Sequence, residues 1–266
     1  MRFNSATIAA CFSGSGSFTA FRQSFCQSCR CLLVITNLPS PQGRNPSKQD
    51  LSVDGGNVVQ FSRPADTEYI NFGLNTVEGY GICDLTTSKS YYDYASDNSG
   101  NWEAPVWTKL SPTKIKLVRV TADGIWELTQ TITQVKASGS HPGAAQVTMS
   151  LKNLSGSTRD AYLLRVADIS VNSDHFDNYF DFTWNTALGS FFRPDRLRFG
   201  LSLTNNTFTF SHYAFTQNTM VGPDPCQPSA HWNCGLFWGQ GTVGQLYHRT
   251  VNAGSTMSVT MTYRPM

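Results

Sequence analysis

The sequence predicts an all-β protein, a large antiparallel β-sandwich of about a dozen strands on the scale of a supersandwich. Apolar and polar residues alternate in segment after segment, and Gly, Asn, Ser and Pro separate these segments. Aromatic residues make up 12% of the chain and favour sheets, because flat rings pack well on a pleated surface. Glu, which is abundant on helical surfaces, occurs only at Glu68, Glu78, Glu103 and Glu127.

The first expected strands lie at 57–62 and 68–73. Segments 115–121 and 125–135 come next, joined by Ala122-Asp123-Gly124. Asp-Gly suits a type I′ turn, so these two segments are expected to form a β-hairpin. In the following segment, Val147, Met149 and Leu151 alternate with polar residues, which predicts a strand with one wet face.

Segment 161–171 differs because its apolar residues occupy both faces, which predicts a central strand buried on two sides. Alternation at 199–203 is followed by Asn205-Asn206 and a segment at 208–215. Asn tolerates the positive φ of a tight turn, so a second β-hairpin is expected there. Further strands are expected at 179–184, 187–192, 236–248 and 257–263.

Residues 1–49 differ in composition from residues 50–266. The first part has basic but no acidic residues and holds most of the 7 cysteines. Its richness in Ser, Phe and Arg is typical of an organelle transit peptide. A cleaved leader, a start codon assigned too early and a disordered tail all remain open. Residues 50–266 are expected to form a single β-sandwich domain.

Several function classes are not expected. The chain has no run of about 18 apolar residues, so no transmembrane segment is predicted. The body has no basic cluster longer than Lys114-Ile115-Lys116, so nucleic-acid binding is not predicted. The G-x-S-x-G elbow of serine hydrolases, the P-loop and the dinucleotide fingerprint are all missing from the sequence.

The densest polar stretch follows the expected central strand. Closely spaced Asp and Asn side chains on a loop supply the oxygen ligands that Ca²⁺ requires, so this stretch is a candidate metal site. Its residues are Asp168, Asn172, Asp174, Asp177 and Asp181. Their spacing departs from the helix–loop–helix calcium motif. Asp and Asn are also ordinary turn residues, so a solvated loop is the alternative.

Three residues are weak catalytic candidates. Glu103 and Glu127 each follow a tryptophan, which can desolvate a carboxylate and stack on a sugar ring, and sugar hydrolysis uses two carboxylates. His175 lies in the polar stretch that follows the central strand. The alternative is that Trp126 belongs to the core and that Glu127, on the opposite face of its strand, is solvated.

Cys226 and Cys234 bracket a short loop, and we expect them to form a disulfide that leaves Cys83 unpaired. A disulfide indicates an oxidising compartment, so the protein is expected to be secreted or otherwise extracytoplasmic. Targeting to an organelle through residues 1–49 is the alternative.

Two stretches place large rings where strand periodicity is not evident. Flat exposed rings are used to bind sugars or peptides, so these rings are the candidate ligand-binding residues. They are Tyr91, Tyr92, Tyr94, Trp102, Trp107, Trp232 and Trp238. The alternative is that the rings fold back and cap the ends of the sandwich.

Three functions remain open. The preferred one is a non-catalytic extracytoplasmic module that binds carbohydrate or a surface partner through the aromatic stretches 91–107 and 226–238. The second is a carbohydrate-active enzyme of the large β-sandwich kind, mutarotase-like or lyase-like. The third is a structural surface protein. An enzyme requires two or more titratable groups within hydrogen-bond reach of one pocket, whereas a binding module requires exposed rings.

Overall fold

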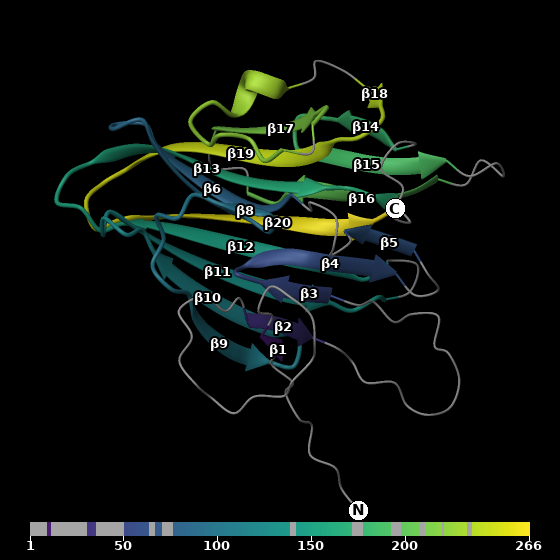
Figure 1. Cartoon of the computed structure of the whole chain (residues 1–266), viewed down its shortest axis with the longest axis horizontal. Coiled ribbons are helices and arrows are strands. Elements are labelled where there is room, and N and C mark those ends of the chain that lie inside the picture. The colour runs from purple at the N-terminus through teal and green to yellow at the C-terminus, as the bar shows by residue number, and fades with distance from the viewer. Residues whose placement is uncertain are drawn as a thin grey trace, which may run out of the picture.

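The computed structural model is built from three antiparallel β-sheets (Figure 1). The structure describes residues 10–11, 31–35, 51–63, 67–70, 77–138, 142–171, 178–192, 198–207, 211–219, 221–232 and 236–266. The two larger sheets pack face to face around an apolar core, which confirms the predicted β-sandwich. No helix among the described residues is long and apolar enough to span a membrane.

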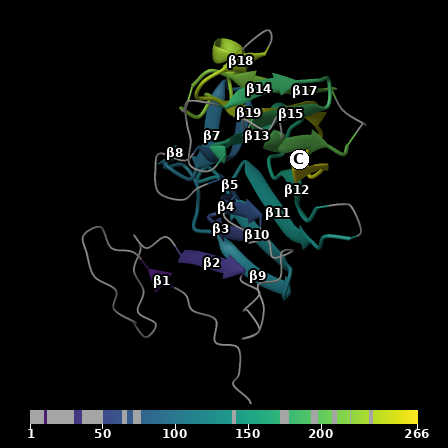
Figure 2. The same cartoon turned by 90° about the vertical axis from the view of Figure 1, so that its right-hand side faces the viewer.

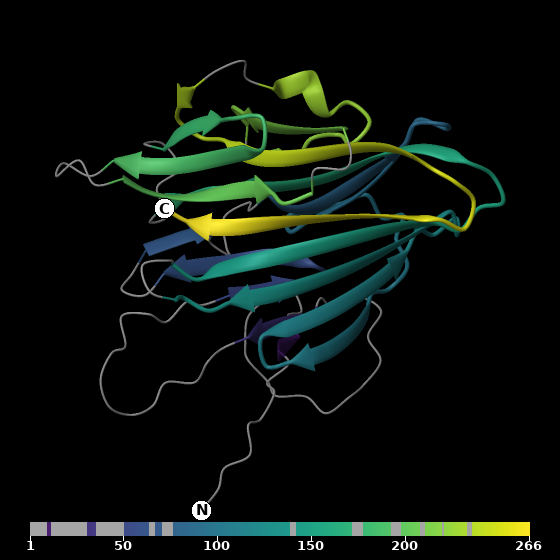
Figure 3. The ribbon, with the colours of Figure 1, turned by 180° about the vertical axis from the view of Figure 1, so that it is seen from behind.

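The largest sheet has nine strands, in the order β18-β14-β15-β16-β20-β12-β11-β10-β9 (Figure 3). Their bounds are β9 (Val106–Ser111), β10 (Lys114–Val120), β11 (Trp126–Val135), β12 (Ala144–Asn153), β14 (Tyr179–Phe182), β15 (Thr186–Phe192), β16 (Arg198–Asn205), β18 (Phe237–Trp238) and β20 (Thr256–Pro265). On its outer face Thr148 bonds Thr260, and Ser150 bonds Ser258. Strand β12 therefore has the single wet face that its alternation predicts.

The second sheet has six strands, in the order β17-β19-β13-β6-β7-β8. Their bounds are β6 (Glu78–Asp84), β7 (Lys89–Tyr94), β8 (Asp97–Asn98), β13 (Arg159–Asp168), β17 (Ser211–Gln217) and β19 (Thr242–Val251). Strand β13 lies between β6 and β19, and from Leu163 onward it is buried on both faces. This confirms the central strand predicted at 161–171.

The third sheet has five strands: β1 (Ala10–Cys11), β2 (Cys31–Ile35), β3 (Leu51–Asp54), β4 (Asn57–Arg63) and β5 (Thr67–Ile70). Strands β3 and β4 lie against the part of the nine-stranded sheet that the six-stranded sheet leaves uncovered (Figures 1 and 2). Residues 31–35 pair with β3. The proposed leader role of residues 1–49 stays a prediction.

A continuous apolar core lies between the three sheets, and side chains from each of them reach it. Val58 and Phe61 come from the small sheet, Leu163 from the six-stranded sheet, and Trp126 and Met261 from the nine-stranded sheet. Trp126 is fully buried, while Glu127 points to the outer face of the same strand. The core interpretation of Trp126 is therefore confirmed.

One buried charge joins all three sheets. Arg165 on β13 is completely buried and donates to Glu78 of β6 at 2.5 Å, to Gln130 of β11 at 2.8 Å and to Tyr263 of β20 at 3.0 Å. It also donates at 3.0 Å to the carbonyl of Gly56, in the turn between β3 and β4. Each of the three sheets thus supplies at least one acceptor to the Arg165 guanidinium.

Glu78 is the counter-charge of Arg165. Burial raises the pKa of Glu78 above its ordinary value, and Arg165, the Tyr263 hydroxyl and the Val58 amide oppose this rise by favouring the charged form. Burying both charges costs solvation energy, which the mutual attraction and the additional hydrogen bonds offset. The pair therefore depends on all of its partners remaining in place.

The turn at Gly55-Gly56 fits closely against this network. Gly56 has a φ of +95°, and a Cβ there would lie 2.3 Å from Gln130 Nε2, so only glycine fits without displacing that amide. The Tyr80 hydroxyl donates to the Gly55 carbonyl at 3.0 Å, and Arg119 donates to the same hydroxyl at 2.9 Å. The turn is thereby hydrogen-bonded to Tyr80 of the six-stranded sheet and, through Tyr80, to Arg119 of the nine-stranded sheet.

The hairpin predicted around Ala122-Asp123-Gly124 is present, but its turn differs from the expected type I′. Val120 pairs with Glu127, and Gly124 donates to the Thr121 carbonyl at 2.8 Å. The central residues of this turn are Ala122 and Asp123, and neither has the positive φ that a type I′ turn needs at both central positions. Asp123 instead accepts hydrogen bonds from the Ile125 amide and the Thr121 hydroxyl.

The hairpin predicted around Asn205-Asn206 is wrong. Strand β16 pairs with β15 and β20 in the nine-stranded sheet, whereas β17 pairs with β19 in the six-stranded sheet. Asn205 is buried, exchanges hydrogen bonds with the Thr207 backbone and accepts one from the Tyr247 hydroxyl at 3.0 Å. Its amide therefore stabilises a crossing between sheets. Similarly, the single strand predicted at 236–248 is divided into β18 and β19, which belong to different sheets.

Replacing Arg165 by Met is expected to lower the free energy of unfolding by about 3–5 kcal/mol, because Glu78 would stay buried without its counter-charge. Urea denaturation measures the change. The exposed pair Lys89–Asp123 is the control, and Lys89→Met should cost about 1 kcal/mol or less. Equal losses in the two variants would contradict a dominant role for Arg165.

Candidate ligand-binding site

The seven predicted ligand-binding rings lie in different places. Tyr91 and Trp102 belong to the main core, where Trp102 makes edge contacts with Tyr91 and Tyr80. Residues 89–94 form strand β7, whose alternate side chains face inward, and Trp102 is held by a β-bridge to Thr121. The prediction that Tyr91 and Trp102 are exposed ligand-binding rings is therefore wrong. Both rings fold back into the sandwich, as the alternative expects.

Trp107 and Trp238 occupy the two opposite edges of the nine-stranded sheet. Trp107 on β9 is partly buried and packs against the main core. Trp238 on β18 is 59% exposed and makes an edge contact with Tyr179, with ring centroids 5.1 Å apart. The structure does not bring these two rings together.

The remaining three rings lie on the outer face of the six-stranded sheet. There Tyr94, Leu164, Val166 and Phe215 form a second apolar cluster, and Tyr92 and Trp232 pack against it. Residues 221–232, which we name the strap, cover the cluster. The Tyr94 hydroxyl donates to the Pro223 carbonyl at 2.6 Å, so Tyr94 is buried beneath the strap and is not a surface ring.

The strap approaches the sheet closely at Gly81 of β6. A Cβ at Gly81 would lie 2.5 Å from Pro225 Cγ and 3.1 Å from the Tyr94 hydroxyl oxygen. Gly222 of the strap likewise lies against the Tyr94 ring. Glycine fits at both positions because the strap rests directly on the β6 backbone at Gly81 and on the Tyr94 ring of β7 at Gly222.

A disulfide between Cys83 of β6 and Cys226 of the strap fixes this contact. The expected bridge between Cys226 and Cys234 is therefore wrong, and so is the expectation that Cys83 is unpaired. Proximity along the chain favoured Cys234, but the fold places Cys226 over β6, with a Cα–Cα distance of 4.9 Å to Cys83. Cys234 itself lies outside the described residues.

On the β17 side of the strap, rings and polar groups gather on one surface. Tyr213 is 54% exposed and lies beside Trp232, which stacks on Phe215 with ring centroids 5.0 Å apart. Tyr162 and His248 are cross-strand neighbours and make an edge contact at 5.2 Å. We name Tyr162, Tyr213, Trp232 and His248 the outer aromatic face.

The outer aromatic face has an acidic neighbour. Both carboxylate oxygens of Asp160 lie 3.0 Å from His248 Nε2, and the Thr250 hydroxyl donates to Asp160 at 3.2 Å. Asp160 and His248 are both partly exposed, so their remaining donor and acceptor capacity faces solvent. Rings beside such a polar pair can contact the apolar and hydroxyl surfaces of one ligand.

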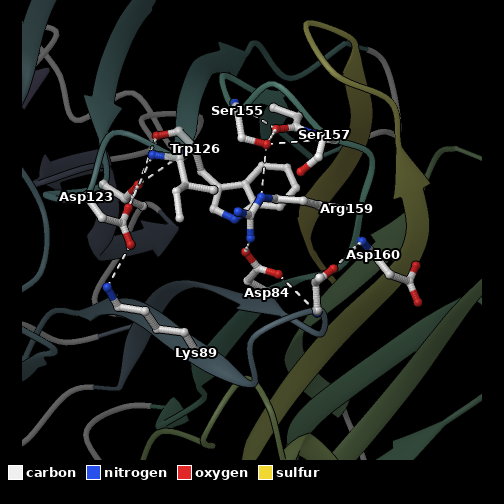
Figure 4. Close-up of polar contacts among 12 residues, drawn as sticks. Asp84, Lys89, Asp123, Trp126, Ser155, Ser157, Arg159 and Asp160 are labelled. Carbon is white, nitrogen blue, oxygen red and sulfur yellow. Dashed lines mark hydrogen bonds and ion pairs between the residues drawn. The ribbon is translucent and has the colours of Figure 1, made fainter.

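Asp160 is positioned by a polar cluster at the end of the sandwich (Figure 4). Arg159 donates to Asp84 and to Ser155, which joins β13 to β6 and to the loop before β13. Thr86 donates its backbone amide to Asp84 and accepts from the Asp160 amide with its hydroxyl. Asp160 is therefore held at a fixed place on the sheet edge.

Tyr92 lies on the far side of the strap from the outer aromatic face. It stacks on Tyr94 with ring centroids 5.1 Å apart. Burial, together with a hydrogen bond and Coulomb repulsion from Asp97, raises its pKa. Because the strap crosses β6 at Gly81 and Cys83, Tyr92 is separated from Tyr162 and Tyr213.

Only some of the predicted metal and catalytic residues lie in the part of the chain that the structure describes. Asn172, Asp174, His175 and Asp177 lie outside the described residues. Of the metal set, Asp168 is buried on β13 and Asp181 lies on β14 in the other sheet. Within the described ranges no group of three His, Cys, Asp or Glu side chains could hold a metal ion.

Glu103 and Glu127 do lie near each other, on the outer face of the nine-stranded sheet. The Glu103 amide donates to the Val120 carbonyl, and Val120 pairs with Glu127. Glu103 is exposed and Glu127 is partly exposed. A glycosidase acid works in a partly desolvated cleft, whereas these carboxylates flank one valine on a sheet surface, so their catalytic role stays a prediction.

Residue patterns alone did not identify Tyr162, Tyr213, His248 and Asp160. All four lie on β13, β17 and β19, and they come together only because these strands are neighbours. The sequence does contain one signal, because Tyr213 and Phe215 are two positions apart, as are Leu246 and His248. Such alternation marks a common face but not which strands adjoin it.

No protein family matches the sequence, and no curated protein matches it. A bacterial glucoamylase in complex with acarbose is similar in structure, with a TM-score of 0.53 and 14% identity over 88% of this chain and 36% of that chain. A protein from Escherichia coli K12, provisionally named an aldose 1-epimerase, gives a TM-score of 0.47 and 10% identity over 88% of this chain and 99% of that one. A 4-α-glucanotransferase from Thermococcus litoralis gives a TM-score of 0.45 and 9% identity over 90% of this chain and 38% of that chain.

The chain spans only about a third of the glucoamylase (36%), and the identity is low. The likeness therefore shows a shared β-sandwich fold and nothing about the site.

Replacing Cys226 by Ser is expected to lower the free energy of unfolding by about 4 kcal/mol, because the disulfide closes a loop with a sequence separation of 143 residues. Urea denaturation of the oxidised protein measures the change, and Cys83→Ser, which removes the same bridge, should cost a similar amount. Peptide mapping without reductant should recover Cys83 linked to Cys226. A peptide linking Cys226 to Cys234 would contradict the assignment.

Proposed function

We propose that this protein is a non-catalytic extracytoplasmic β-sandwich module that binds carbohydrate with its outer aromatic face. The observation that carries the proposal is that Tyr162 contacts His248 of the Asp160–His248 pair, while Tyr213, with Trp232 beside it, lies on the strand next to His248. The rings are partly or largely exposed, and strands β13 and β17 and the disulfide-linked strap hold them.

The chemistry of the surface suits a sugar. A pyranose presents apolar C–H groups that pack on an aromatic face, and its hydroxyls bond to side chains at the rim. Tyr213 and Trp232 offer the ring surface, while Asp160 and His248 offer charge-assisted hydrogen bonds. Little ordering is needed on binding, because the disulfide and the stacking of Trp232 on Phe215 hold the strap in place.

The extracytoplasmic location is supported by the Cys83–Cys226 disulfide, since structural disulfides persist in oxidising compartments. The shared fold with a glucoamylase, described in complex with acarbose, is consistent with a carbohydrate ligand but does not identify one. The enzymatic alternative, mutarotase-like or lyase-like, has less support. Asp160 and His248 bond each other on a partly exposed surface, whereas the acid and base of an enzyme work in a cleft that shields them from water.

A glycan array with the full-length protein tests the proposal, followed by calorimetric titration of the best oligosaccharide. Tyr213→Ala is expected to weaken binding by about tenfold or more, because a stacking ring is removed from an exposed position. Trp238→Ala is the matched control: it removes a ring of similar exposure from the other sheet and should leave affinity unchanged.

The outcomes separate the alternatives. Affinity lost in Trp238→Ala but kept in Tyr213→Ala would place the binding site at the β14–β18 edge instead. Conversion of the bound sugar would favour the enzymatic function. Absence of binding to every glycan on the array would overturn a carbohydrate ligand and leave the structural surface protein as the better explanation.

A further inference from the structure

Three polar side chains are neighbours at the end of the outer face remote from Asp160. Asp168 on β13 pairs with Thr242 on β19, and Thr242 pairs with Gln217 on β17. Strand alternation turns all three to the same side as Val166 and Phe215 of the second apolar cluster. The Cβ atoms of such cross-strand neighbours lie about 4.5–5.5 Å apart, so the three side chains share one small region.

This region is buried and rich in acceptors. Asp168 is 4% exposed, and Thr242 and Gln217 are 0% exposed. Within the described part of the chain, the side-chain donor to the Asp168 carboxylate is Ser170, at a long 3.5 Å. Thr242 Oγ1 and Gln217 Oε1 have no hydrogen-bond partner among the described residues, although Gln217 Nε2 donates to the Val221 carbonyl.

A buried carboxylate without a positive partner is costly, because it loses its hydration and gains little in return. Burial is the main cause that raises the pKa of Asp168 to about 7, and the Ser170 hydrogen bond opposes it. Among the described residues, no charged side chain contributes to this shift. On the other side of Asp168, Val77 accepts a hydrogen bond from the Asp168 amide with its carbonyl, and its apolar side chain is 2% exposed.

The donor set fits a particular class of ligand. Carboxylate, hydroxyl and amide oxygens are hard ligands and suit hard cations rather than zinc or copper. A single carboxylate supplies one negative charge, so a monovalent ion neutralises the site, whereas a divalent ion would leave an uncompensated positive charge in a buried place.

We propose that Asp168, Thr242 and Gln217 form a site for a small monovalent cation, with Na⁺ as the fitting ion. The site shares only Asp168 with the calcium loop predicted from the sequence, since its other ligands come from β17 and β19. The proposal stands on the positions of these three residues and does not depend on carbohydrate binding.

An ion at this site would also stabilise the strap. Gln217 forms a β-bridge with Trp232 and donates to Val221, so one ligand of the ion contacts both ends of the strap. Cation binding therefore stabilises the segment that presents Trp232, while the Cys83–Cys226 disulfide fixes its middle.

Thermal unfolding of the full-length protein in choline chloride and in NaCl, at equal ionic strength, tests the proposal. At pH 8 and an Na⁺ concentration well above the dissociation constant, Na⁺ is expected to raise Tm by about 5 °C. The increment should be smaller at pH 5, because the buried carboxylate then holds a proton that the cation must displace. Parallel runs with KCl and CaCl₂ establish which ion the site selects.

Asp168→Asn and the isosteric Thr242→Val are expected to abolish the Na⁺-specific increment. Asp181→Asn, a partly exposed carboxylate on the other sheet, is the matched control and should keep it. An equal Tm in NaCl and choline chloride for the wild-type protein would overturn the proposal without any variant. An increment given by CaCl₂ alone would overturn the choice of a monovalent ion, and an increment that survives Asp168→Asn would overturn the site.

Discussion

Arg165 carries its charge at the place where the three sheets meet, and each sheet supplies an acceptor to it. The six-stranded sheet contributes Glu78, the nine-stranded sheet Gln130 and Tyr263, and the small sheet the carbonyl of Gly56. A buried ion pair adds little net stability by itself, but breaking one is costly. The network therefore specifies how the three sheets are arranged, because another packing would leave a buried charge without partners.

The same arrangement determines what the outer surfaces can present. With the inner face of the six-stranded sheet committed to the core, its outer face holds a second apolar cluster that requires a cover. The strap supplies that cover through Gly81, Gly222 and the Cys83–Cys226 disulfide. Covering only part of the face leaves Tyr162, Tyr213 and His248 partly exposed at its border, which is where recognition is proposed.

Alternation predicted most strands correctly, because side chains on a half-buried strand must change face at every residue. It failed where strands do not alternate visibly. Strand β6 contains Gly79, which faces the β7 backbone, and Gly81, which faces the strap, so its sequence lacks large apolar residues at these positions. Strand β7 carries tyrosines on both faces, so its sequence shows no alternation of apolar and polar residues, and the burial of Tyr91 does not follow from it.

The sequence by itself determined the fold class, the two-faced burial of β13 and the core position of Trp126, since these follow from local spacing of apolar residues. Only the tertiary structure decided which strands are neighbours. Asn205 leads to a crossing between sheets, Cys226 pairs with Cys83, and Asp168 adjoins Thr242 and Gln217. Such pairings arise between segments distant in sequence, and the packing of whole sheets, rather than any local preference, selects them.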